Sequence, residues 1–321
     1  MSGLTRFVLA AFAGWIVAGN HAASAQDWYP DRPVRLIVGF GAGGPTDIPA
    51  RFIASKLGDL LKQTVVVENR TGASGVLATR YVLSQPQDGH TILFCTHFEG
   101  LNSVDKTAGY QLGDIAPISL VVKYFSVVTV SPELPVETLA EFIRYAKDKP
   151  GEVTYSTVGV MSPQEIVSLR LAKLAGITMR RVPFRTGPQI IPDLLAGRVH
   201  LYVAPTIAML PLYRDRKVKV LAVTSPERLK EIPEVPTLVE QGYSYAPFGW
   251  LGFCVGAKTP PAIVATLGRH IRAIAESAEY RDLIAQGGAT PVSSTPDELR
   301  RVLEQTADDA GAVIREFGVK E

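Results

Sequence analysis

Three glycines in one short loop are the strongest chemical signal in the sequence. They stand in "LIVGFGAGGPTDIPAR", residues 36–51, with the spacing Gly39-x-Gly41-x-x-Gly44. Between a strand and a helix, this spacing lets a dinucleotide pyrophosphate approach the backbone, and an acidic residue about 20 positions later binds the ribose. Glu68, at the end of the apolar run "TVVVE", is the acidic candidate. One hypothesis is therefore a nicotinamide or flavin site.

The residues around the glycines favour a smaller anion. Glu68 comes 29 residues after Gly39 (68 − 39), and Pro45 and Pro49 remove backbone donors that a pyrophosphate would use. We expect Thr46 or Asp47 to cap the following helix, with Asp47 directing its charge to that helix's own donors. The remaining N–H groups and the helix dipole then suit a small carboxylate. The sequence predicts no cofactor.

Catalytic motifs give no clear alternative. The segment "Gly72-Ala73-Ser74-Gly75" lacks the spacer of a G-x-S-x-G nucleophile turn. None of the histidines stands in a Ser/His/Asp, HExxH or zinc-binding pattern; they are His21, His90, His97, His200 and His270. The sequence therefore predicts a binding protein and no metal, with an exported enzyme acting on a carboxylate as the alternative.

The two cysteines leave their redox state open. Cys95 and Cys254 stand in the apolar contexts "TILFCTH" and "LGFCVGA". In an oxidising compartment they could pair, but a sequence cannot supply the Cα separation that a disulfide requires. We expect two buried free thiols at strand ends.

The N-terminus predicts export. Arg6 precedes an apolar stretch from Phe7 to Gly19, and the small-residue pattern Ala23-Ser24-Ala25 follows. This is the anatomy of a signal peptide (residues 1–25) cut before Gln26, and the apolar stretch is shorter than the roughly 20 residues of a membrane span. The net charge of +2, with Lys and Arg spread along the chain, gives no nucleic-acid footprint.

Strands alternate with helices after residue 26, which predicts parallel βαβ units. The apolar run Ile115–Val130 is too long for one mean strand, and "FGWLGFCVGAKTPP", residues 248–261, is a second candidate crossing. Two crossings predict two lobes: residues 26–124 with 247–321, and residues 125–246. Ligands of such sheets bind in a cleft at the carboxyl ends of the strands.

A family pattern runs through the same residues. "YPDRPVRLIVGFGAGGPTDIPAR", "VVVENRTGASGVLATRYVLSQPQDGHTIL" and "LAVTSPERLKEIPEVPTLVEQGY" resemble the Bug-type extracytoplasmic solute receptors, the TctC-like receptors of tripartite tricarboxylate transporters. The resemblance implies an α/β type II periplasmic-binding-protein fold, with two Rossmann-like lobes joined by two crossing strands. It implies a periplasmic, monomeric receptor that delivers a carboxylate to membrane transporter subunits; a sensor feeding a signalling system is a further alternative.

The resemblance also implies which residues line the cleft. Backbone N–H groups of two strand-to-helix loops and ordered waters would hold the carboxylate. Carried over residue by residue, the ligand-binding residues of the first lobe are Phe40, Gly41, Ala42, Gly43, Gly44, Thr46, Asp47, Thr96, His97 and Phe98. Those of the second lobe and its edge are Thr157, Gly159, Met161, Ser162, Phe184, Arg185, Ala204, Pro205, Thr206 and Phe248.

The second-lobe loop departs from the family pattern. Met161 replaces a glycine, Glu165 replaces a histidine, and Ala204 stands where many relatives place an Asp. The missing acid argues against an amino-acid ligand, and an apolar wall favours an aromatic or otherwise hydrophobic carboxylate over citrate.

Structural roles compete with several of these assignments. Met161 could fill a packing gap, Phe184 and Phe248 could be core, and Arg185 could be solvated. His97 taken alone reads as a surface or capping histidine, and Glu68-Asn69-Arg70 as a structural turn.

Overall fold

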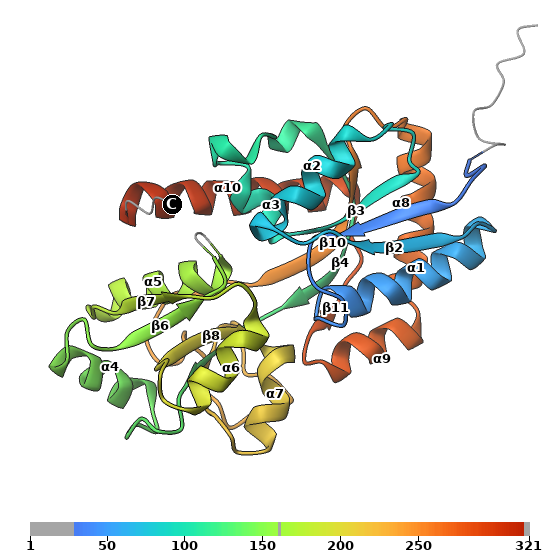
Figure 1. Cartoon of the computed structure of the whole chain (residues 1–321). Coiled ribbons are helices and arrows are strands. Elements are labelled where there is room, and N and C mark those ends of the chain that lie inside the picture. The colour runs from blue at the N-terminus through green and yellow to red at the C-terminus, as the bar shows by residue number, and fades with distance from the viewer. Residues whose placement is uncertain (1–28, 160–161, 318–321) are drawn as a thin grey trace, which may run out of the picture.

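The first lobe is built on a six-stranded mixed sheet. The computed structural model describes residues 29–159 and 162–317, and its two lobes are seen in Figure 1. The strand order is β11-β4-β10-β3-β1-β2. Its strands are β1 (Val34–Val38), β2 (Val65–Asn69), β3 (Thr91–Thr96), β4 (Ile115–Tyr124), β10 (Gly249–Gly256) and β11 (Thr290–Pro291). β1 is parallel to β2 and β3, whereas β10 is antiparallel to both β3 and β4.

Helices cover both faces of this sheet. Apolar side chains of β1 and β3 pack with α1 (Asp47–Leu61), α8 (Pro261–Ala275) and α9 (Ala278–Gln286) on one face. The other face is covered by α2 (Val76–Ser84), α3 (His97–Asn102) and the long α10 (Pro296–Phe317). Short 3₁₀ turns stand at η1 (Ala73–Gly75), η2 (Lys106–Ala108) and η3 (Leu112–Asp114).

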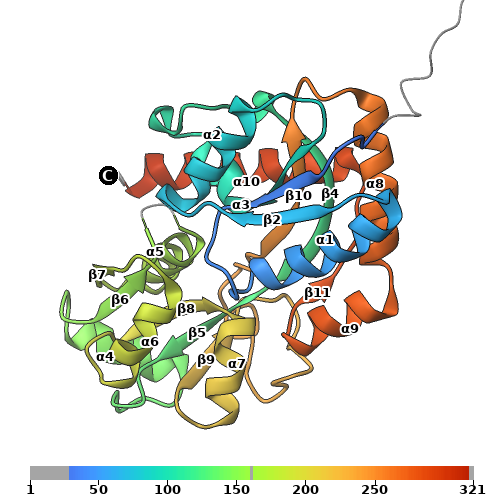
Figure 2. The ribbon, with the colours of Figure 1, turned by 45° about the vertical axis from the view of Figure 1, so that its right-hand side comes forward.

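The second lobe repeats the plan with five strands in the order β7-β6-β8-β5-β9. They are β5 (Ser126–Val130), β6 (Thr154–Thr157), β7 (Arg180–Pro183), β8 (Leu201–Pro205) and β9 (Lys219–Val223). One face packs against α4 (Leu139–Asp148) and α5 (Pro163–Ala175), and the other against α6 (Gly187–Leu195) and α7 (Thr206–Arg214), as Figure 2 shows.

Two segments carry the chain between the lobes, as predicted. β4 and β5 are separated only by Phe125, so the apolar run Ile115–Val130 leaves one sheet and enters the other. The chain returns through residues 224–248 into β10. The expectation of parallel units is confirmed for β1, β2 and β3 and for β6, β7 and β8. The crossing strands β4, β5 and β10 run antiparallel to their neighbours. β5 lies between β8 and β9, and since both are antiparallel to it they run parallel to each other.

Cys95 and Cys254 form a disulfide, so the expectation of free thiols is wrong. Cys254 of β10 pairs with Leu93 and Gly252 with Cys95, which makes the two cysteines diagonal neighbours on adjacent strands. Their Cα atoms lie 5.8 Å apart, within the range that a disulfide spans. The pairing depends on the return of β10 beside β3, which spacing along the chain does not reveal.

Candidate functional site

The predicted loops lie at the carboxyl ends of the parallel strands of both sheets. In the first lobe, residues 39–46 follow β1, residues 70–72 follow β2, and α3 follows β3 directly. In the second lobe, the corresponding segments follow β6, β7 and β8. These ends are where open α/β sheets bind ligands.

The loop between β1 and α1 is folded on itself by backbone hydrogen bonds. Gly44 N–H donates to Gly41 O (3.3 Å), Asp47 N–H donates to Gly44 O (3.0 Å), and Gly43 has a φ of +74°. Gly41, Ala42 and Gly43 are exposed. Among the residues that the structure describes, no acceptor lies on the N–H groups of Gly41 and Ala42. These two groups can therefore donate to a ligand.

The expected helix cap is absent, and Asp47 has a different role. Thr46 is the N-cap of α1 without a side-chain hydrogen bond. Asp47 is 1% exposed, and its Oδ2 accepts from the Gly43 N–H (2.8 Å) and from Arg51 Nε (2.6 Å). Its Oδ1 accepts from Asn69 Nδ2 (2.8 Å). Burial acts to raise the pKa of Asp47, but these hydrogen bonds outweigh burial and hold the pKa below its usual value. Asp47 is thus an internal partner of the loop, and the prediction that it serves its own helix's backbone donors is wrong.

Thr96 and Glu99 fix the start of α3 by a capping box. Thr96 Oγ1 accepts from the Phe98 N–H (3.1 Å), and Glu99 Oε2 accepts from the Thr96 N–H (2.5 Å). Thr79 donates to Glu99 Oε1 (3.0 Å), and Glu99 is 2% exposed. Burial raises the pKa of Glu99 to about 7, against the hydrogen bonds from Thr96 and Thr79.

His97 is buried, so its interpretation as a surface histidine is wrong. Its Nδ1 lies 3.1 Å from the hydroxyl oxygen of Tyr124, the last residue of β4 before the crossing. Its ring contacts those of Phe98, Tyr124 and Trp250. Burial lowers the pKa of His97 to about 3, so the imidazole is neutral. A neutral His97 adds hydrogen-bonding capacity but no charge for an anion.

The loop after β6 is held by hydroxyl groups. Thr157 Oγ1 lies 2.6 Å from Ser162 Oγ and donates to Gly159 O (2.6 Å), while Ser162 caps α5. Glu165, which departs from the family pattern, is 1% exposed and pairs with Arg181 (3.1 Å). Met161 lies outside the described residues.

The other predicted residues are distributed around the second lobe. Phe184 is half-buried against the core of that lobe, whereas Arg185 is exposed after β7. Ala204 is fully buried in β8, and Pro205 is half-buried at the start of α7. Thr206 donates to Phe125 O (2.6 Å) and so ties α7 to the crossing. Phe248 is 41% exposed beside Lys123, at the entry to β10.

Contacts between the lobes bring part of the predicted site together. Phe40 and Phe98 have ring centroids 5.2 Å apart and pack in one apolar cluster with Ile166 of α5. Across the same interface, a Cβ on Gly159 would lie 3.0 Å from Ser74 Oγ. Ile166 comes from the opposite lobe, so the cluster spans the interface.

Sequence reasoning missed Asn69, Ser74 and Tyr124. Ala73 (φ +45°) and Ser74 (φ +50°) adopt a left-handed conformation that non-glycine residues rarely enter, and Asn102 Nδ2 donates to Ser74 O (3.0 Å). The flanking Gly72 and Gly75 were the available signal for an unusual turn. Tyr124 carried none, because its role depends on where the crossing begins.

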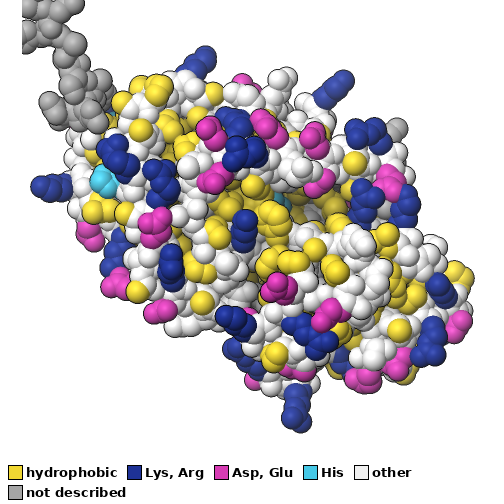
Figure 3. Space-filling model, turned by 180° about the vertical axis from the view of Figure 1, so that it is seen from behind, with side chains coloured by type: hydrophobic (Ala, Val, Ile, Leu, Met, Phe, Trp, Pro, Cys, Tyr) yellow, Lys and Arg dark blue, Asp and Glu magenta, His cyan; other side chains and the backbone are white. Residues whose placement is uncertain are grey.

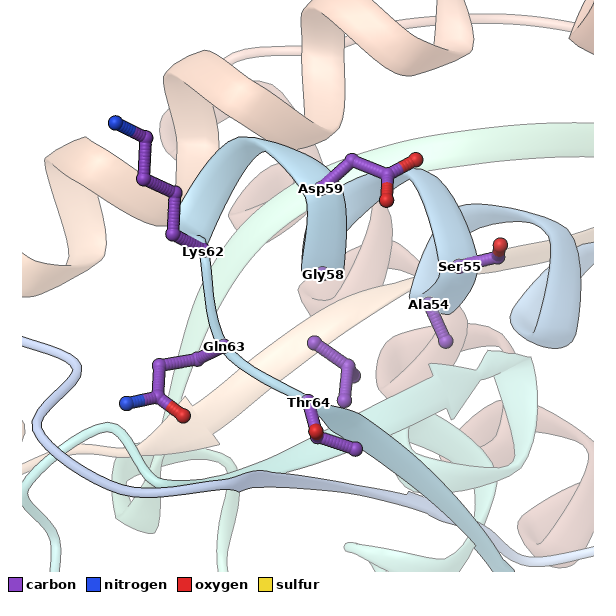
Figure 4. A pocket seen from close by; sticks show the side chains of 8 residues that line it. Ala54, Ser55, Gly58, Asp59, Lys62, Gln63 and Thr64 are labelled. Atoms are coloured by element: carbon purple, nitrogen blue, oxygen red, sulfur yellow. The ribbon is translucent and has the colours of Figure 1, made fainter.

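One surface depression lies away from these loops. It is lined by residues at the end of α1 and the start of β2, among them Gly58, Asp59, Lys62 and Thr64 (Figure 4). The start of β2 is the amino end of that strand, whereas the loops described above follow the carboxyl ends of the strands. This depression is therefore not part of the candidate site. In the view of Figure 3, positive and negative side chains are interspersed over the molecular face.

Two properties of the described chain bear on its class. Within residues 29–159 and 162–317, no three His, Cys, Asp or Glu side chains are grouped to hold a metal. None of the helices in these same ranges has the length and apolar character needed to cross a membrane.

Known proteins match both the sequence and the fold. The family described as "Tripartite tricarboxylate transporter family receptor" matches residues 49–319. Protein BugT of Bordetella pertussis is 33% identical over 309 residues, covering 94% of this chain and 94% of BugT. These similarities span nearly the whole chain, and they agree with the resemblance found in the motifs.

Solved structures extend the comparison. The R. palustris protein Rpa4515 with adipate has a TM-score of 0.84 at 29% identity, covering 91% of this chain and 99% of that one. The periplasmic binding protein BugD has a TM-score of 0.82 at 29% identity with the same coverages. MatC from Rhodopseudomonas palustris with bound malate has a TM-score of 0.81 at 25% identity, covering 89% of this chain and all of MatC. The predicted periplasmic-binding-protein fold is therefore confirmed.

Proposed function

The chain belongs to the tripartite tricarboxylate transporter receptor family, and from this membership we propose that it captures a small carboxylate between its lobes. One observation carries the proposal: the N–H groups of Gly41 and Ala42 in the exposed loop have no acceptor among the described residues. The neighbouring carboxylate, Asp47, is buried, and both of its oxygens accept hydrogen bonds from the protein. Backbone donors at the start of a helix favour an anion without a counter-cation. The adipate and malate bound to two similar proteins support this class of ligand.

The apolar surroundings favour a ligand with a hydrophobic or aromatic body. Phe40, Phe98 and Ile166 form an apolar cluster between the lobes, and His97 beside it is neutral. An apolar body buried there gains about 25 cal/mol for each Å² removed from water, whereas a charged group placed against the same cluster would lose hydration. The predicted residues of both lobes other than Asp47 form the proposed binding set, with ordered waters completing the contacts. Asp47 holds the loop instead, since its carboxylate and its N–H are both used within the protein.

The remaining assignments follow from the family. We propose export with cleavage near Ala25, a monomeric receptor in the periplasm, and delivery to membrane subunits of a tripartite tricarboxylate-type transporter. Lobe boundaries at residues 124–125 and 246–247 belong to the same proposal.

A thermal-shift panel on residues 26–321 tests the ligand class. We expect benzoate or adipate to raise the melting temperature more than citrate, because a ligand that binds only the folded protein stabilises it. Benzamide, which keeps the ring and loses the charge, is the matched control. A shift with a nicotinamide dinucleotide and none with any carboxylate would overturn the proposal.

The matching family and structures are of binding proteins. Incubating the protein with each carboxylate that binds, and analysing the solution for products, tests passive capture. Recovery of unchanged ligand supports a receptor, and turnover would establish the enzyme alternative.

A further inference from the structure

We propose that Asn69 is a positioning residue that closes the β1–α1 loop and thereby orients the backbone donors of the ligand site. The inference rests on the proposed function, because it assigns the loop's purpose to carboxylate binding. Asn69 is the last residue of β2 and is not in that loop itself.

The side-chain amide of Asn69 joins the two ends of the loop. Its Nδ2 donates to Phe40 O (2.8 Å), near the start of the loop, and to Asp47 Oδ1 (2.8 Å), at the first residue of α1 directly after the loop. Its Oδ1 accepts from Arg51 Nη2 (2.8 Å). Both amide hydrogens are therefore used, and the Arg51 contact fixes which end of the amide carries them.

The effect passes from Asn69 through Asp47 to the donors. The same Asp47 carboxylate that accepts from Asn69 accepts from the Gly43 N–H. Gly43 is at φ +74°, and this turn leaves the Gly41 and Ala42 N–H groups exposed without a described acceptor. Without the Asn69 side chain, the Phe40 carbonyl and one oxygen of Asp47 lose their hydrogen bonds to β2. The turn is then no longer held in a fixed position relative to the sheet.

Neighbouring charges make a neutral amide necessary at this position. Asp47 already faces one cation, Arg51, at 2.6 Å. The flanking Glu68 and Arg70 pair with each other (3.1 Å), and Glu68 also pairs with Arg35 (2.6 Å). A carboxylate at position 69 would keep the Arg51 donor on one oxygen, but its other oxygen would face Asp47 Oδ1 and Phe40 O with no donor between them. A protonated carboxyl there could donate to Asp47 as the amide does.

The test uses Asn69→Ala and Asn69→Asp in residues 26–321, with Gln63→Ala as the matched control. Gln63 is an amide just before the opposite end of β2. Calorimetry with adipate at pH 5 and pH 8 gives Kd for each variant as a ratio to the wild type at the same pH. Hydrogen exchange of the ligand-free proteins follows the peptide that contains residues 40–47.

We expect Asn69→Ala to raise Kd about tenfold, corresponding to about 1.4 kcal/mol, and to speed exchange in residues 40–47. Asn69→Asp should raise Kd more than Asn69→Ala at pH 8 and recover toward the wild-type value at pH 5, where the carboxyl pair shares a proton. Gln63→Ala should change neither quantity. A structural role alone would lower stability without making the Kd ratio of Asn69→Asp depend on pH.

Two results would overturn the inference: exchange in residues 40–47 unchanged by Asn69→Ala, or a Kd ratio for Asn69→Asp that is the same at both pH values. Failure of the proposed function looks different. In that case the wild type itself binds neither adipate, malate nor benzoate, while the exchange measurement on the ligand-free variants still decides whether Asn69 orders the loop.

Discussion

At the scale of single residues, the candidate site keeps its own charges away from an anion. Asp47 is engaged by Arg51, Asn69 and the Gly43 N–H, and His97 is neutral because it is buried. Glu99 is the exception, since it is buried beside Thr96 and its carboxyl receives hydrogen bonds only from uncharged groups among the described residues. The stability of this lobe should therefore depend on pH through Glu99.

Glu99→Gln tests this dependence. Burial raises the pKa of folded Glu99 to about 7 from an ordinary 4.5, so its stabilising contribution is complete below pH 4.5 and is lost as the pH rises through about 7. We expect the wild type to lose stability relative to Glu99→Gln between pH 5 and pH 8. The loss is at most a few kcal/mol, since a tenfold change in proton affinity corresponds to about 1.4 kcal/mol. Urea unfolding at the two pH values measures the difference.

Glu141→Gln is the matched control for Glu99→Gln. Glu141 fills the same capping-box position at the start of α4 but is only partly buried. Hydrogen bonds from the Glu137 and Thr138 N–H groups lower the pKa of Glu141, so its contribution is lost only as the pH falls below its ordinary value. A difference between wild type and Glu99→Gln that stays constant from pH 5 to pH 8 would contradict the prediction.

At the scale of elements, local sequence patterns predict most of the helices and strands, but few of the contacts between residues on different strands. Alternating apolar runs predict β1, α1, β2, α2 and β3, and the unusual length of Ile115–Val130 predicts the crossing. Helices α3 and α7 were not anticipated: α3 is six residues long, and α7 contains Pro211 in its interior. Short length and an internal proline both weaken the helical pattern.

The candidate site divides along the same line. The glycine loop is a local sequence motif and was predicted, whereas the residue that positions it, Asn69, is contributed by the neighbouring strand β2. Ser74 faces Gly159 from the other lobe, so their approach depends on how two separately folded sheets meet. The disulfide likewise joins residues 159 positions apart. None of these pairings leaves a periodic or spacing signal.

The disulfide between β3 and β10 should contribute substantially to stability. It closes a loop of 159 residues and restricts the unfolded chain, and native disulfides of this kind contribute roughly 2–5 kcal/mol. We expect the free energy of unfolding of the double variant Cys95→Ala/Cys254→Ala to be lower by that amount, so that it unfolds at a lower urea concentration. Reductant should destabilise the wild type and leave the double variant unchanged. Equal stability of the two proteins without reductant would contradict the prediction.

At the scale of the whole molecule, ligand affinity depends on what the lobes gain by approaching each other. Away from the apolar cluster, Arg170 and Lys173 of α5 both form ion pairs with Glu316 of α10. Helix α10 packs on α3 and β4 of the first lobe, so these ion pairs link its last turn to the second lobe. Because α5 also carries Ser162 and Glu165 at its start, the contact is connected to the proposed binding loop.

Glu316→Gln should weaken ligand binding by weakening the approach of the lobes. The three side chains are partly exposed (22–54%), so the contact is worth at most about 1 kcal/mol, and Kd should rise by about two- to fivefold. Since salt screens exposed pairs, the difference between variant and wild type should shrink between 50 mM and 500 mM NaCl, concentrations at which the Debye length falls from about 14 Å to about 4 Å. Glu304→Gln, an exposed carboxylate earlier on α10, controls for the loss of one negative charge from a receptor of anions. If both variants change Kd equally, the effect is one of net charge. If Glu316→Gln leaves Kd unchanged at low salt, the ion pairs do not contribute to the closure of the lobes around the ligand.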